Sequence, residues 1–133
     1  MVDKSALNDH FLIACENGDI DLARQALESG AESDCYNSVH ESAVHLAVKS
    51  GSEKMVQYLT HELRLNPDSR DSFGRTPLHW AAQQGNVPVA EALLMAHARI
   101  SAKDDNGVEP KIYAELAGHN VLVRMLSSIR RQK

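Results

Sequence analysis

The amino-acid sequence predicts an all-α solenoid of about four helix–turn–helix units with β-turn or hairpin-like connections. The first observation is a nearly constant period, about 33 residues, in four glycines, Gly18, Gly51, Gly85 and Gly118. The second is that an alanine stands four residues before each of them, at Ala14, Ala47, Ala81 and Ala114. The third is that each unit carries two short apolar stripes with helical spacing. A fixed period of this length is typical of stacked repeats.

The first two units are less regular than the third. Unit one, about residues 5–37, begins with "ALNDHFLIACENGDIDLARQALESGA", in which Asn8, Asp9 and His10 are interleaved with apolar residues. Unit two, about residues 38–70, carries "ESAVHLAVKSG" and one extra residue near "THELRLNPD". That residue predicts a longer connection between the second helix of this unit and the turn that follows.

The third unit, about residues 71–103, shows the start and stop signals of a helix most clearly. Thr76 is a plausible N-cap, and Pro77 stands at the first helical position, where proline is tolerated. Gly85 ends this helix, because glycine adopts the left-handed conformation that helix ends favour. Pro88 falls in the first turn of the second helix, and "SAKDDNG" follows as a turn.

The fourth unit, about residues 104–130, closes the predicted array with the helix "NVLVRMLSSIRRQK". Polar end units are expected of caps, whose outer faces meet water. Helices of eight to ten residues are too short to be stable alone, so each unit needs its neighbours. We therefore expect one domain over residues 1–133, with the first and last units as caps.

The residues of the third unit resemble the ankyrin repeat pattern, roughly D-x-x-G-x-T-P-L-H-x-A-A-x-x-G, then an apolar helix ending in L-L-x-x-G-A. The matching residues are Asp71, Gly74, Thr76, Pro77, Leu78, His79, Ala81, Ala82, Gly85, Leu93, Leu94 and Ala98. Unit two replaces Thr-Pro by Ser42 and Ala43, and unit one lacks this stretch. Unit four has "EPKI" in its place. The resemblance implies the solenoid fold and gives His45 and His79 a structural role, with hydrogen bonds to backbone between units.

Length and composition exclude several classes of protein. No apolar run among the 133 residues approaches a membrane span, and the N-terminus is too polar for a signal peptide. Two cysteines, Cys15 and Cys35, fit a reducing compartment. We expect a cytoplasmic location, with the nucleus as the alternative. The cations of "IRRQK" are interpreted as complementing the C-terminus of a helix, and not as a localisation signal.

The net charge of −4 argues against general nucleic-acid binding and is unevenly distributed. Residues 1–67 hold eleven acids and five bases, whereas residues 68–133 hold seven acids and nine bases. A cation row of Arg70, Arg75 and Lys103 on the turn tips would favour nucleic-acid binding, which remains the least favoured alternative.

No pattern of catalytic or metal-binding residues is present. The remaining histidines form no HxxxH or CxxC spacing, and both cysteines are interpreted as inert thiols. Phosphate-binding loops and a calcium loop are also absent from the sequence. We therefore expect a chain that is not an enzyme, that needs no cofactor or metal, and that binds no small-molecule substrate.

The resemblance implies a protein-binding module that presents a concave face to a folded partner, as an adaptor or inhibitor. The alternative is a structural or targeting domain of a larger polypeptide. We expect a chain that is monomeric on its own and makes no membrane contact. The positions that the ankyrin pattern leaves free for recognition are Ser38, Val39, Glu41, Lys49, Ser50, Arg70, Ser72, Phe73, Arg75, Gln83, Gln84, Lys103, Asp105 and Asn106.

Two aromatic residues have competing interpretations. Phe73, flanked by Arg70 and Arg75, has the composition of an interface anchor. The alternative is that its ring folds back against Pro77 or Trp80 of its own unit. For Trp80, we expect core packing in preference to contact with a ligand.

Overall fold

The structure is a computed structural model that describes residues 3–131, except for the side chains of Arg130 and Arg131. The interpretation of "IRRQK" therefore depends on side chains outside the described residues. The elements are α1 (Lys4–Asn17), α2 (Ile20–Glu28), α3 (Ala43–Ser50), α4 (Glu53–Gln57), η1 (Tyr58–Glu62), α5 (Pro77–Gln84), α6 (Val87–Met95), α7 (Pro110–Ala117) and α8 (Asn120–Arg131). The predicted all-α fold class is confirmed.

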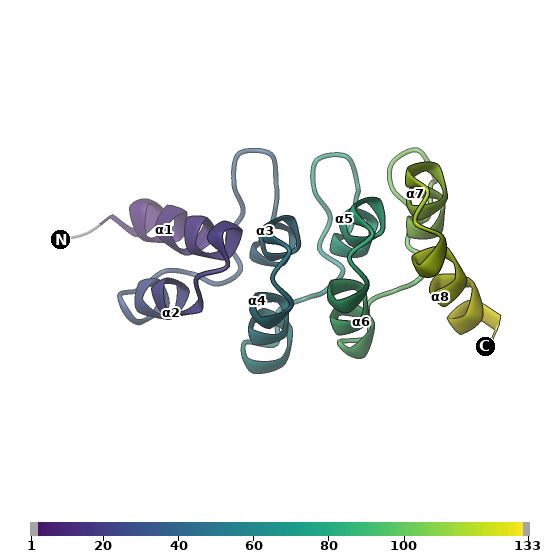
Figure 1. Ribbon diagram of the computed structural model, residues 1–133. Helices are drawn as coiled ribbons and strands as arrows, with labels where there is room; N and C mark the ends of the chain where they lie inside the picture. Colours follow the sequence, from purple (N-terminus) through teal and green to yellow (C-terminus); the bar gives the residue numbers. More distant parts are fainter. Residues whose placement is uncertain (1–2, 132–133) are drawn as a thin grey trace.

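The helices form two layers along an extended array (Figure 1). The inner helices α1, α3, α5 and α7 pack on one another in sequence, and α4 packs on α6 in the second layer. Three hairpin-like connections, called fingers below, project beside the inner layer, and the two termini lie at opposite ends (Figure 1). Each finger joins the second helix of one unit to the inner helix of the next.

The helix signals of the third unit have the predicted geometry. Thr76 is the N-cap of α5 in extended conformation, Pro77 is the first helical residue, and Gly85 ends the helix with φ 73°. A β-carbon on Gly85 would also overlap the imidazole of His119, so a larger residue at this position would require that side chain to move. At Gly85 the glycine signal of the sequence therefore marks a close contact between units as well as a helix end.

The extra residue of unit two lies in its helix, not in the connection after it. After α4 the chain continues as a π-helical turn, η1, in which Leu63 N–H donates to the Tyr58 carbonyl across five residues (3.1 Å). A π-turn takes up one residue more than an α-turn. The prediction of a longer helix-to-turn connection is therefore wrong, because the insertion widens the helix.

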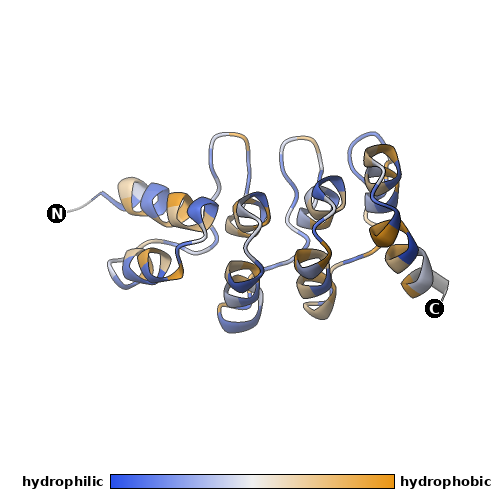
Figure 2. Ribbon diagram, viewed as in Figure 1, coloured by the Kyte–Doolittle hydropathy of each residue, from blue (hydrophilic) through white to orange (hydrophobic). Residues whose placement is uncertain are grey.

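The core is one continuous cluster that runs between the layers through all four units. Phe11, Met55, Leu59, Leu78 and Leu93 are among its largest fully buried side chains. Hydrophobic residues concentrate on the helices, while the fingers and loops are mainly hydrophilic (Figure 2). Because each unit shares this core with its neighbours, helices of eight or nine residues are stable in the array.

Candidate partner-binding surface

The three fingers form a connected edge. A backbone hydrogen bond closes each finger, as between Asp71 N–H and the Arg75 carbonyl (3.0 Å). Neighbouring tips are also joined, since Ser72 N–H donates to the Val39 carbonyl (3.2 Å) and Asp105 N–H donates to the Phe73 carbonyl (3.0 Å). The tips therefore hold a fixed spacing relative to one another.

Asp71 organises the second finger. Its Oδ1 accepts the backbone N–H groups of Phe73 and Arg75, both at 2.9 Å. Its Oδ2 accepts Nε of Arg75 at 2.9 Å and Nε1 of Trp80 at 3.2 Å. Burial alone would raise the pKa of this carboxyl, but these backbone donors and the Arg75 guanidinium outweigh burial and lower the pKa. Asp71 is therefore a buried, fully bonded carboxylate that fixes both ends of the turn.

The Arg75 guanidinium lies between two aromatic rings. Its Cζ is 5.0 Å from the centroid of Phe73 and 5.4 Å from that of Trp80, within the range of a cation–π contact. Phe73 does not fold back into the core: 64% of its surface is exposed. The structure thus favours the exposed position of Phe73 over the folded-back alternative.

Trp80 is part of the core, as predicted. It is 8% exposed, and its ring makes an edge contact with His45, with centroids 5.2 Å apart. Two cations nevertheless lie over the ring, since Nζ of Lys49 is 5.5 Å and Cζ of Arg75 is 5.4 Å from its centroid. The buried Trp80 ring therefore lies beneath the charged groups of Lys49 and Arg75.

A row of equivalent positions runs along the inner helices beside the fingers. Glu16, Lys49, Gln83 and Leu116 follow one another at the interval of the glycine repeat, and all four are exposed. Nζ of Lys49 lies 4.0 Å from carboxylate oxygens of both Glu16 and Glu41. Sequence reasoning missed Glu16 and Leu116, although the period that identifies Lys49 and Gln83 also points to them.

The predicted recognition residues divide into three groups by exposure. Eleven are exposed: Ser38, Val39, Lys49, Arg70, Ser72, Phe73, Gln83, Gln84, Lys103, Asp105 and Asn106. Ser50 and Arg75 are partly buried. Glu41 departs from the prediction of a free surface position, because it is only 8% exposed.

The first finger explains the burial of Glu41. Asn37 stands where the second finger has Asp71, and Glu41 stands where it has Arg75, each one repeat earlier in the chain. Nδ2 of Asn37 donates to Oε1 of Glu41 at 2.8 Å, and Oδ1 of Asn37 accepts the Glu41 N–H at 2.8 Å. An amide–carboxylate pair thus replaces the carboxylate–guanidinium pair of the next finger.

Of the three cations of the predicted row, Arg70 and Lys103 lie together and Arg75 does not join them. Arg70 and Lys103 line a hollow of about 430 Å³ together with Arg99 and Glu109. Nη1 of Arg70 donates to the carbonyl of Lys103 at 2.6 Å. Arg75 does not line this hollow and is bound to Asp71 instead. Arg75 thus lies apart from the hollow that Arg70 and Lys103 share.

His45 and His79 have the predicted structural role. Nε2 of His45 donates to the Arg75 carbonyl (2.8 Å) and Nε2 of His79 to the Val108 carbonyl (2.7 Å), each in the next unit. Nδ1 therefore accepts hydrogen bonds, and in His79 it takes the Thr76 N–H at 3.0 Å. Burial lowers the pKa of both imidazoles, and the carbonyl partners oppose this effect.

The two cysteines are free thiols with little nucleophilic character. Burial raises the pKa of Cys15 to about 12 and that of Cys35 to about 11. Among residues 3–131, no group of three or more histidine, cysteine or acidic side chains is arranged to hold a metal ion. Within the same residues, no helix is long and apolar enough to cross a membrane.

Comparisons with known proteins agree with this architecture. The chain is 28% identical to ankyrin repeat protein nuc-2 of Neurospora crassa over 99% of its own length and 13% of that protein. It is 24% identical to a putative ankyrin repeat protein of Rickettsia bellii, over 82% of this chain and 61% of the relative. Over 59% of its length it is 38% identical to 26S proteasome non-ATPase regulatory subunit 10 of Dictyostelium discoideum, of which it covers 34%.

The chain spans less than two thirds of the length of each of these relatives. The family model described as ankyrin repeats in three copies matches residues 11–104 and again residues 63–130. These matches include all four helix pairs at least in part. The chain therefore belongs to the ankyrin repeat family, whose repeats are in general non-catalytic modules for protein–protein interaction.

Proposed function

We propose that this chain is an adaptor or inhibitor that holds a folded protein partner against its finger tips and the exposed side of its inner helices. The observation that carries this proposal is the exposure of Phe73 at a tip that is held in place. Its own backbone is bonded to Asp71 and to the next finger, and its ring lies against the Arg75 guanidinium. An exposed aromatic ring beside an arginine is typical of interface hot spots.

The surface around Phe73 suits a protein partner with both apolar and charged groups. Val39 is exposed at the neighbouring tip, and Ser72 joins the two tips through hydrogen bonds to the Val39 carbonyl. Towards the inner helices the surface continues through Lys49 to Gln83. A rigid site of this kind loses little conformational entropy on binding, which favours affinity.

The proposal includes the cytoplasm, or alternatively the nucleus, as the place of action and a chain that is monomeric before it binds. A structural or targeting module within a longer polypeptide is the second candidate. It is supported by the relatives, since nuc-2 is a protein of which this chain spans 13%. Nucleic-acid binding is disfavoured, because Arg75 is committed to Asp71 at 2.9 Å and does not extend a cation row.

A single substitution at the finger tip tests the proposal. Phe73→Glu should abolish capture of the principal partner from lysate of the native cell, read by mass spectrometry. Met95→Glu is the matched control, because Met95 is 69% exposed on α6 of the second layer. The control should retain the partner. If both variants capture the partner, the binding site lies outside the fingers. If neither variant captures it, binding has been lost in general and the result says nothing specific about Phe73.

Arg75 should not be changed in this experiment. Its side chain is bound to Asp71 and packs against Trp80, so its removal would disturb the finger as well as the surface. Phe73→Glu changes none of the three residues Asp71, Arg75 and Trp80. Circular dichroism of both variants before the capture step verifies that a lost partner reflects the surface and not the fold.

A further inference from the structure

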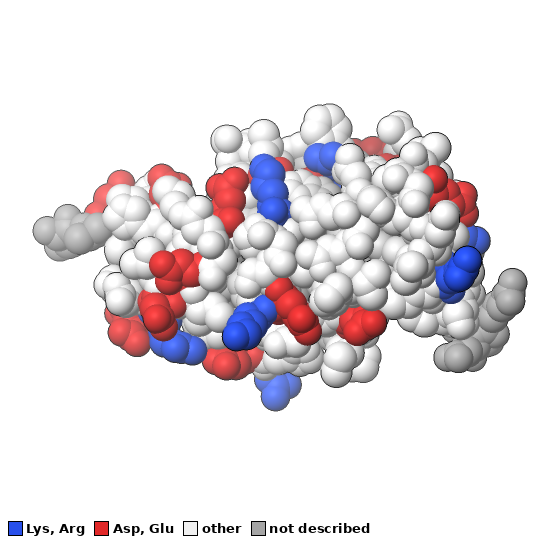
Figure 3. Space-filling model, in the orientation of Figure 1, with Lys and Arg blue, Asp and Glu red and all other residues white. Residues whose placement is uncertain are grey.

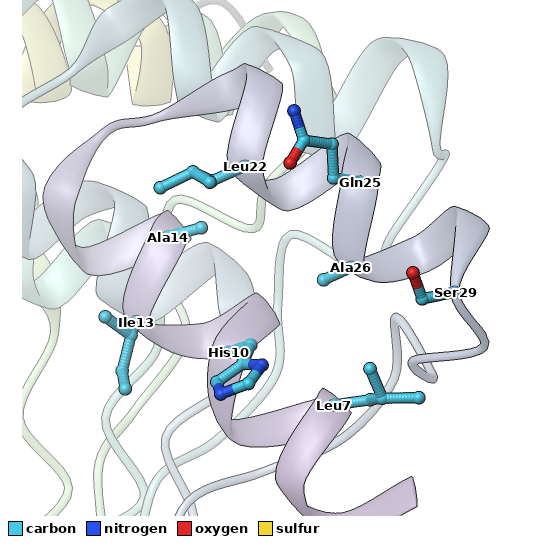
Figure 4. Close-up of a pocket in the computed structure, with 8 residues that line it drawn as sticks. All are labelled: Leu7, His10, Ile13, Ala14, Leu22, Gln25, Ala26 and Ser29. Atoms are coloured by element: carbon cyan, nitrogen blue, oxygen red, sulfur yellow. The ribbon is translucent and has the colours of Figure 1, made fainter. Parts of the chain in front are cut away.

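The end of the array formed by α1 and α2 carries an open apolar groove. Leu7, His10, Ile13 and Ala14 of α1 and Leu22, Gln25, Ala26 and Ser29 of α2 line a space of about 360 Å³. Figure 4 shows these side chains across the gap between the two helices. Ile13 and Leu22 are each about half exposed, at 53% and 51%. None of the predicted recognition residues lies in this groove.

The repeat period shows what normally covers this position. Met55, Val89 and Leu122 are equivalent to Leu22 in the later units, at successive steps of the glycine repeat, and all three are fully buried. Ile13 is likewise equivalent to Leu46 and Trp80, which are buried, and to Tyr113, which is partly buried. In the inner layer of those units the helix of the preceding unit packs alongside, as α1 does on α3 and α3 on α5. The groove therefore corresponds to positions that are covered in the later units and are open in the first.

The charge of the first unit restricts the helix that fits. Residues 3–37 contain eight acids and two bases. Both bases lie near carboxylates, since Lys4 is 4.0 Å from Glu32 and Arg24 is 3.9 Å from Asp21. Acidic side chains gather at this end of the molecule (Figure 3). Asp21 and Glu28 belong to α2, the helix that also carries the groove residues Leu22 and Gln25.

We propose that this groove binds an amphipathic, basic helix of a protein partner. The apolar face of the helix would cover Ile13 and Leu22, and its cations would face the acids of the first unit. A second copy of this chain in head-to-head contact is a poorer occupant, because two acidic end units repel each other.

The probe is a fluorescent amphipathic peptide of leucine and lysine with the length of α1, 14 residues. The matched peptide has glutamate in place of lysine. Fluorescence anisotropy should show binding of the lysine peptide and not of the glutamate peptide. No binding of the lysine peptide would overturn the proposal.

Two substitutions separate the groove from general charge attraction. Leu22→Glu adds a negative charge, which strengthens non-specific attraction to a cationic peptide but removes the apolar contact. We expect it to weaken binding about tenfold or more. Leu116→Glu adds the same charge at an exposed leucine of α7, outside the groove, and should leave binding within about twofold. If the two variants bind alike, charge alone holds the peptide and the groove is not its site.

The result is independent of the finger surface. Phe73→Glu should bind the lysine peptide as the wild type does, because Phe73 does not line the groove. Amide shift perturbations on titration should map to α1 and α2. Perturbations at the fingers instead would place the peptide on the surface proposed for the folded partner and contradict the groove.

Discussion

Nε2 of His79 lies 2.7 Å from the carbonyl oxygen of Val108, a residue 29 positions further along the chain and in the next unit. The same imidazole accepts the N–H of Thr76, the N-cap of its own helix. One side chain thus starts a helix and bonds it to the following finger. Both ring nitrogens of His79 are hydrogen-bonded, so a side chain with a single polar atom cannot replace the imidazole.

His79→Ala should lower the free energy of unfolding by about 3 kcal/mol, since it leaves the Val108 carbonyl and the Thr76 N–H without this partner and removes a fully buried side chain. Urea denaturation measures the effect. His119→Ala is the control. Its Nε2 donates to the Gln83 carbonyl at 2.9 Å in an exposed setting, so about 1 kcal/mol is expected. Equal losses in the two variants would contradict the connecting role of His79.

Mild acidification should destabilise the protein. Burial lowers the pKa of His45 and His79 below the ordinary value of 6.5, so the unfolded state binds more protons as the pH falls. The stability that the two neutral imidazoles contribute is complete above about pH 6.5 and is lost as the pH falls through their lower folded values. The urea midpoint should therefore decrease between about pH 7.5 and pH 5.

Burial is the largest cause of the lowered pKa values of His45 and His79, and charged neighbours modify it. Asp71 and Glu41 favour protonation of His45, while Arg75 opposes it. Asp104 favours protonation of His79, and Arg70 opposes it. A His79→Ala variant should show a shallower dependence on pH than the wild type. A flat wild-type profile over this range would contradict the lowered pKa values.

The hydrogen-bonded pair of the second finger, Asp71 and Arg75, should be replaceable by the kind of pair that Asn37 and Glu41 form in the first finger. Asp71→Asn keeps an oxygen for the backbone N–H groups of Phe73 and Arg75 but loses the carboxylate partner of the guanidinium. Adding Arg75→Glu recreates the pair that Asn37 and Glu41 form at 2.8 Å. The double variant should therefore be more stable than the sum of the two single effects by about 1 kcal/mol. Thermal denaturation of the four proteins in this cycle gives the coupling energy.

Additive effects in that cycle would mean that the two pairs are not interchangeable, and Trp80 offers a specific reason. Its Nε1 donates to the Asp71 carboxylate at 3.2 Å, whereas Leu46 holds the equivalent position in the second unit and has no such donor. Trp80→Leu in the background of the double variant separates the two explanations. This substitution should restore the stability of the double variant only if the indole N–H of Trp80 is what prevents the exchange of pairs.

Much of the framework follows from sequence, because local backbone geometry dictates it. Thr76, Pro77 and Gly85 each satisfy a helix end, and those requirements can be recognised without knowing any neighbour. Glu41 shows where this reasoning stops. Its position in the pattern is free, yet its burial depends on Asn37 across the turn and on Lys49 of α3.

The candidate surface was predictable in outline and not in detail. The repeat period identified Lys49 and Gln83. Whether the ring of Phe73 is exposed or buried depends on its contact with Arg75, and only the folded finger brings these two side chains together. The insertion in unit two was visible as one extra residue. Its absorption by a π-turn depends on packing of Tyr58 and Leu59 in the core, which spacing alone does not reveal.

A last prediction concerns backbone strain after the second helices. Arg64 and His97 have φ of 56° and 70°, and Gly30 holds the equivalent position in the first unit with φ 116°. The left-handed conformation costs a residue with a β-carbon about 1 to 2 kcal/mol, and glycine avoids this cost but loses more entropy on folding. His97→Gly should therefore raise the free energy of unfolding by about 0.5 to 1 kcal/mol.

His97→Ala is the control, because alanine retains the β-carbon and hence the strain, so it should change stability by less than about 0.5 kcal/mol. Arg64→Gly should act like His97→Gly, and the two gains should add, because the positions lie in different units, one repeat apart. Urea denaturation of the three single variants and the double variant measures both claims. If alanine stabilises as much as glycine, the gain comes from removal of the imidazole, and relief of left-handed strain is not its cause.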